Sequence, residues 1–87
     1  MQNQLRPDEA VARLSDEQID RVVLDFMLED HPYPWHLDEL GRELGSQTGA
    51  IDAVGRLTRT GLIHRWGDFV FPSRTAARAA QVQIGTV

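Results

Sequence analysis

The dipeptide Gly45-Ser46 places the strongest constraint on how this chain can fold. Leucines recur at helical spacing before it, over residues 36–44, and a second helical pattern resumes at residue 47. Glycine commonly ends a helix, which leaves Ser46 as the one linking residue. A connection this short predicts that the two helices cross at a steep angle, as in a helix-turn-helix.

An earlier helix is expected to start at the sequence SDEQ, residues 15–18, which has the form of a capping box. It ends before the prolines of DHPYPW, residues 30–35. Its apolar stripe consists of Ile19, Val22, Val23, Phe26 and Met27. Leu24 and Leu28 lie outside that stripe, so they need cover, which Val11 and Leu14 or a second copy of the chain could supply.

The two helices that meet at Gly45-Ser46 have recognisable faces. In the first, His36 occupies the cap position, and the stripe is Leu37, Leu40 and Leu44. In the second, expected over 47–60 and ended by Gly61, the stripe is Ala50, Ile51, Val54, Leu57 and Thr58. At 100° per residue, Asp52, Arg56 and Arg59 cluster on its opposite face.

A two-stranded hairpin is expected over residues 62–71, because two β-favouring runs flank the turn Gly67-Asp68. This turn sets Trp66 opposite Phe69 and His64 opposite Phe71. The aromatic residues and Leu62 then share one face, while Ile63, Arg65 and Val70 share the other. Both faces carry apolar groups; one must pack on the helices, and the other is available to a partner. Ser73 can cap a last short helix over 74–81.

The length of 87 residues predicts one domain. We expect residues 1–14 to form an N-terminal extension, with a short helix within 7–14 that begins at Pro7. Residues 15–80 form the domain, and residues 81–87 are expected to be a flexible tail.

Charge is divided unevenly along the chain. The net charge is −4, but residues 1–45 carry four arginines and eleven acids, whereas residues 46–87 carry five arginines and two acids. Salt screens charges beyond about 8–10 Å, so a local surface matters more than the total. We therefore expect an exposed ridge of positive charge along the 47–60 helix and the neighbouring hairpin.

Several classes of function find no support in the composition and motifs. The chain has no cysteine, and the spacing of His31, His36 and His64 matches no metal-ligand pattern, so we expect no metal site and no cofactor. There is no nucleophile elbow and no phosphate-binding glycine loop, so no catalytic residue is expected and the protein is predicted not to be an enzyme. The sequence has no membrane-length apolar run and no secretory signal, which favours the cytoplasm.

Three segments together carry a resemblance: LDELGRELG at 37–45, AIDAVGRLTRTGLI at 50–63 and HRWGDFVF at 64–71. In this order they resemble the winged helix-turn-helix superfamily of bacterial transcription regulators, over roughly residues 15–80. The resemblance implies a mainly α fold: three helices, a two-stranded β-hairpin wing and a short C-terminal helix.

The resemblance also implies a transcription regulator that binds double-stranded DNA, with the 47–60 helix in the major groove and the hairpin on the backbone or minor groove. The DNA-binding candidates carried over by position are Ser46, Gln47, Thr48, Asp52, Arg56, Arg59, Arg65, Trp66, Gly67 and Arg74. Asp52 departs from this pattern, because its carboxylate repels phosphate; it could accept from cytosine or pair with Arg56.

Two partners other than DNA stay open. A homodimer would cover the unpacked leucines and would supply a second DNA half-site. Alternatively, the module binds another protein and no DNA, through the acidic N-terminal half and the free face of the hairpin.

Overall fold

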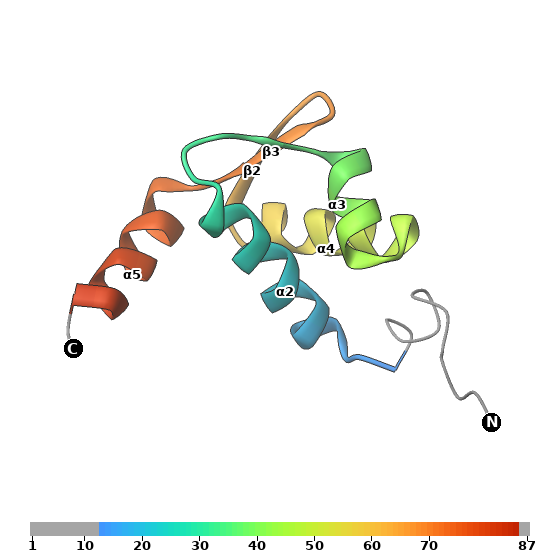
Figure 1. Ribbon diagram of the computed structural model, residues 1–87, viewed down its shortest axis with the longest axis horizontal. Coiled ribbons are helices and arrows are strands. Elements are labelled where there is room, and N and C mark those ends of the chain that lie inside the picture. Colours follow the sequence, from blue (N-terminus) through green and yellow to red (C-terminus); the bar gives the residue numbers. More distant parts are fainter. Residues whose placement is uncertain (1–12, 86–87) are drawn as a thin grey trace.

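The computed structural model describes residues 13–85 of the chain as a mainly helical protein with a small three-stranded antiparallel sheet (Figure 1). The elements in chain order are α2 (Asp16–Glu29), β1 (Trp35–His36), α3 (Leu37–Leu44), α4 (Gln47–Arg59), β2 (Ile63–Trp66), β3 (Phe69–Pro72) and α5 (Arg74–Gly85). The short helix expected within 7–14 lies largely outside the described residues. Among the helices of residues 13–85, none has the length and apolar character needed to cross a membrane.

Side chains cap the helices as predicted. At the start of α2 the amide of Gln18 donates to Ser15 Oγ at 3.1 Å, and the amide of Ser15 donates to Gln18 Oε1 at 2.8 Å. At the start of α3 the imidazole Nδ1 of His36 accepts from the Asp38 amide at 3.1 Å, and Glu39 completes the capping box. Each contact satisfies a backbone donor that the first turn of a helix leaves free.

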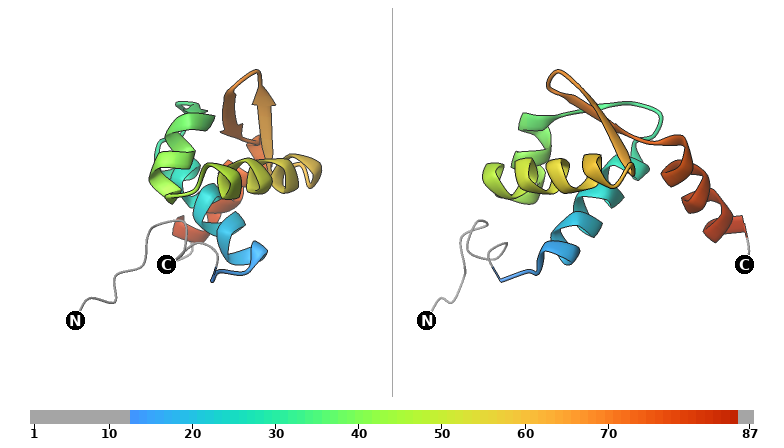
Figure 2. Two further views of the ribbon diagram at one scale, coloured as in Figure 1. Left: turned by 90° about the vertical axis from the view of Figure 1, so that its right-hand side faces the viewer. Right: turned by 180° about the vertical axis from the view of Figure 1, so that it is seen from behind.

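The connection between α3 and α4 is as tight as predicted, and α4 runs across the end of α3 at a steep angle (Figure 2). Gly45 takes the left-handed conformation with φ of 83°, and Ser46 Oγ accepts from the Gly49 amide at 3.0 Å. Gly41 is buried where the helices meet: a Cβ at this position would lie 3.1 Å from the Cα of Gln47. The helices therefore approach so closely here because residue 41 has no side chain.

The core lies where α2, α3 and α4 meet the inner side of the sheet. The residues with no more than 1% of their surface exposed are Val23, Met27, Leu40, Ala50, Ala53, Val54, Ile63 and Val70. The predicted stripe of α4 was wrong at two positions, because Ile51 is 45% exposed and Thr58 is also exposed; Ala53, which the prediction left out, is buried. The small side chains of Ala50 and Ala53 let α2 and α3 approach α4 closely. Alanine adds little to an apolar stripe that is defined by large side chains, which is why Ala53 was left out of the prediction.

The hairpin has the predicted register, with Trp66 paired to Phe69 and His64 paired to Phe71. The sheet has a third strand that was not expected, because β1 pairs with β3 through Trp35–Val70 and His36–Phe69. The strand order is β1-β3-β2. Two residues after a proline are too short a run to show an alternating pattern, so β1 had no signal in the sequence.

Helix α5 begins as predicted, with Ser73 Oγ accepting from the Ala76 amide at 3.1 Å. It continues to Gly85, so residues 82–85 are helical where a tail was expected. From its first turn, beside the end of β3, α5 diverges from α2 (Figures 1 and 2).

Candidate docking surface on α4 and the hairpin

The face of α4 that points away from the core is uncovered along the helix. We call it the α4 outer face and define it by Thr48, Ile51, Asp52, Gly55 and Arg59. All but Gly55 are exposed, and Gly55 is half-buried. The opposite side of α4 carries the buried residues Ala50, Ala53, Val54 and Leu57.

Packing within the described residues does not require glycine at position 55. Among residues 13–85, a Cβ added there would meet only the Arg59 Nη1 atom, at the ordinary contact distance of 3.7 Å. Glycine in a helix interior costs about 1 kcal/mol relative to alanine. Because Gly55 has no side chain, another molecule can approach the helix backbone closely in the middle of the α4 outer face.

Arg56 does not lie on the α4 outer face as predicted; it is held against α2. Its Nε and Nη2 atoms donate to Asp20 Oδ1 at 3.0 and 2.8 Å, and Asp16 lies 3.6 Å from its Nη1. The hydrogen bond to Asp20, followed by the attraction of both carboxylates, raises the pKa of Arg56 despite burial. The sequence prediction was wrong because α2 packs across this side of α4, which the wheel of a single helix does not reveal.

The first turn of α4 holds the next candidates, Ser46, Gln47 and Thr48. Ser46 caps the helix, and the Gln47 amide group donates to the Leu37 carbonyl at 3.4 Å, so both side chains already have partners. Thr48 is exposed, and the first turn contains no acidic residue. The positive end of the helix dipole is therefore not neutralised by a carboxylate of its own turn.

At the hairpin tip, Arg65 stabilises the turn. Its Nε donates to the Gly67 carbonyl at 2.7 Å, and its Nη2 lies 3.9 Å from Asp68 Oδ1. Gly67 has φ of 62°, a conformation that favours glycine. Trp66 extends into solvent with 82% of its surface exposed.

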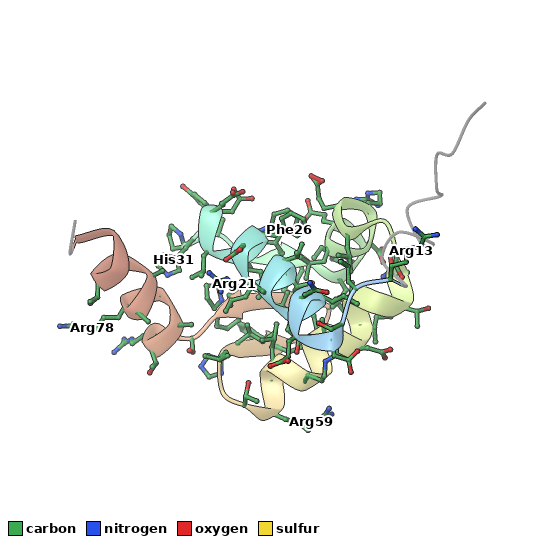
Figure 3. All side chains as sticks on the ribbon, turned by 90° about the horizontal axis from the view of Figure 1, so that it is seen from below. Arg13, Arg21, Phe26, His31, Arg59 and Arg78 are labelled. Carbon is green, nitrogen blue, oxygen red and sulfur yellow. The ribbon has the colours of Figure 1, made fainter. Side chains whose placement is uncertain are left out.

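The predicted ridge of positive charge does not form. Arg56 and Arg65 are paired with carboxylates, and Arg74 belongs to α5. Figure 3 shows Arg59 and Arg78 at separate edges of the molecule. The α4 outer face and the hairpin tip together carry two arginines, Arg59 and Arg65, and two acids, Asp52 and Asp68. For Arg56 the cause is the acidic α2, whose Asp16 and Asp20 carboxylates hold the guanidinium against that helix.

The outward side of the sheet forms a second surface, which we call the aromatic face: His36, His64, Trp66, Phe69 and Phe71. His36 contacts the edge of the Phe69 ring with centroids 5.1 Å apart, and His64 lies 5.7 Å from Phe71. Ile63 and Val70 are fully buried, so the other side of the hairpin is the one packed on the helices. The sequence predicted that the hairpin rings share a face, but not that this face is outward or that β1 adds His36.

No cluster of three or more histidine, cysteine or acidic side chains in residues 13–85 is arranged to hold a metal ion. Comparison with protein-family models, with curated proteins and with solved structures finds no match for this chain.

Proposed function

We propose that the protein is a winged helix-turn-helix module that docks on duplex DNA with the α4 outer face in the major groove and the hairpin beside it, and that it regulates transcription. The observation that carries the proposal is the exposed α4 outer face. Its central residue, Gly55, has no side chain, although the described part of the fold leaves room for one. The order of helix, short strand, two steeply crossed helices and hairpin supports it.

Each part of this surface has a role in the proposed docking. Thr48 and the free amides at the start of α4 suit a phosphate, because the first turn carries no acid. Arg59 reaches a phosphate or a guanine edge, and the small side chain at Gly55 lets the helix sit deep. Because two acids offset the two arginines of this surface, its electrostatic attraction for the DNA phosphates is weak. Since each phosphate contact contributes about −0.9 to the salt slope, we expect a slope no steeper than about −2.

Removing the Arg59 guanidinium is expected to weaken duplex binding and to make the salt slope shallower by about 1, because one phosphate or base contact is lost. Fluorescence anisotropy of Arg59→Ala with mixed-sequence duplexes, at several salt concentrations, measures both quantities. The control is Arg21→Ala, which removes the same charge from α2 and should change neither. Equal affinity of the parent and both variants, or no duplex binding at low salt, would contradict the proposal.

A second candidate function is docking on another protein through the aromatic face, and one observation favours it. Trp66 is the most exposed large hydrophobic side chain of the described residues, and it adjoins other rings on an open surface. Clustered exposed apolar groups mark interaction sites, and tryptophan is over-represented among residues that dominate binding energy. Helix α2, which packs on the opposite side of the sheet, offers a separate acidic surface to a basic partner.

Under this alternative, Trp66→Ala is expected to abolish capture of a stoichiometric protein partner from nuclease-treated lysate. The fold should be unchanged, because the ring is 82% exposed and contributes little burial. Tyr33→Ala is the matched control, since Tyr33 is an aromatic residue with similar exposure outside the aromatic face. A partner that is retained by Trp66→Ala, or lost equally from both variants, counts against docking through this face.

A further inference from the structure

An apolar groove separates α2 from α5. Its apolar part is lined by Leu24 and Leu28 of α2, by Leu62, and by Ala76, Ala79 and Ala80 of α5. Leu24 and Leu28 are only half-buried, so within the described residues the cover that the sequence led us to expect is incomplete. The two helices that border this α2–α5 groove diverge from each other along their length (Figure 1).

Helix α5 has two distinct sides. The side toward the groove carries alanines, whose small side chains allow another helix to pack closely. The other side carries Arg74 and Arg78, four residues apart, and Figure 3 shows Arg78 directed away from α2. Neither arginine has an ion-pair partner in residues 13–85, and α5 contains no acidic residue.

Helix α2 has the opposite charge. It contains five acids, at positions 16, 17, 20, 25 and 29, and one arginine, Arg21, for a net charge of −4. Asp25 and Glu29 border the α2–α5 groove. Asp25 shares its charge with Arg21 at 3.5 Å, whereas Glu29 has no ion-pair partner among the described residues.

We propose that a second copy of this chain fills the groove. The two copies are related by a two-fold axis, and each inserts its α5 into the α2–α5 groove of the other. Each α5 then lies between the α2 and the α5 of the other copy. The alanine sides of the two α5 helices face each other, and the arginine side of each faces the acidic α2 of its partner. The inference concerns assembly alone, so it goes beyond the proposed DNA docking and does not depend on it.

A second copy fits this groove because the same two-fold axis provides a partner for the alanine side and for the arginine side of α5. The alanines gain a close helix–helix contact, and the two arginines gain carboxylate partners that residues 13–85 of their own chain do not supply. The aliphatic stems of Arg74 and Arg78 would also cover Leu24 and Leu28 of the partner's α2.

Sedimentation velocity on the full chain without DNA, from low micromolar to near-millimolar concentration, tests the proposal. We expect a concentration-dependent species with the mass of two chains. The charge reversals Glu29→Arg and Arg78→Glu should each weaken association about tenfold or more, because the two-fold axis repeats every change. Glu43→Arg makes the same reversal on an exposed face of α3 and should have no effect.

The double variant Glu29→Arg/Arg78→Glu is the decisive measurement, because it restores opposite charges across the proposed contact. Its association should return close to that of the parent, while circular dichroism shows that all variants fold. A chain that stays monomeric at the highest concentration overturns the proposal. So does a dimer indifferent to both single reversals, or a double variant weaker than either single one. None of these results bears on whether one copy binds DNA.

Discussion

Asp20→Ala is expected to lower the free energy of unfolding by about 2–3 kcal/mol, the cost of removing hydrogen bonds to a charged group that stays partly buried. Asp20 and Arg56 expose only 21% and 26% of their side chains, and Arg56 donates to Asp20 through two nitrogens. Without the carboxylate, the guanidinium keeps its place beside α2 with only the more distant Asp16 as a partner.

Urea unfolding at a fixed chain concentration measures this loss. Asp25→Ala is the matched control on the same helix, since the Asp25–Arg21 pair is 56% and 74% exposed. Exposed pairs contribute roughly 0–1 kcal/mol, so this control should change little. Adding Arg56→Ala to Asp20→Ala should cost less than the sum of the single changes, because the two residues share one interaction. If Asp20→Ala lowers the free energy of unfolding no more than Asp25→Ala does, the Asp20–Arg56 pair between α2 and α4 contributes no more than an exposed ion pair.

The same pair has a defined dependence on pH. The hydrogen bond to Asp20 raises the pKa of Arg56 above the ordinary arginine value. A raised pKa stabilises the fold fully at pH below the unfolded value, and this contribution is lost only as the pH rises through the folded value. Alkaline loss of stability at any ordinary working pH would therefore have to come from other groups.

Gly41→Ala is expected to destabilise the protein by about 1–3 kcal/mol, as overpacking of a close helix contact typically does. The new Cβ would lie 3.1 Å from the Cα of Gln47, and backbone cannot move aside as a side chain can. The gain of about 1 kcal/mol from replacing glycine inside a helix offsets only part of this cost.

Gly55→Ala makes the same chemical change where there is room for it, so it should raise stability by up to about 1 kcal/mol. Thermal unfolding of the two variants in parallel compares the signs directly. If Gly41→Ala matches or exceeds the stability of the parent, the close contact between α3 and α4 is not what the structure indicates. Under the proposed function, Gly55→Ala should also weaken duplex binding, which would link the glycine to docking rather than to folding.

Features that depend on neighbours in the chain could be predicted well. The caps at Ser15, His36 and Ser73, the helix end at Gly45 and the hairpin register each involve residues a few positions apart. Their hydrogen bonds form whenever the local backbone forms, so the local residue pattern is enough to anticipate them.

The candidate site was predicted less completely, and Arg56 illustrates why. The spacing grouped Arg56 with Asp52 and Arg59 on the face opposite the apolar stripe, but its partner Asp20 lies on α2, 36 positions earlier in the chain. Likewise, strand β1 exists only because β3 is beside it, and its two residues would not form a strand alone.

The sequence alone therefore determined where α2, α3 and α4 begin, the steep crossing at Gly45-Ser46 and which hairpin side chains share a face. Only the tertiary structure decided that the aromatic face is outward, that Arg56 is bound by α2 rather than free, and that α5 diverges to leave a groove. The physical reason is that the first set depends on short-range geometry and hydrogen bonds. The second depends on which of several apolar or charged surfaces, distant in the chain, bury most favourably against one another.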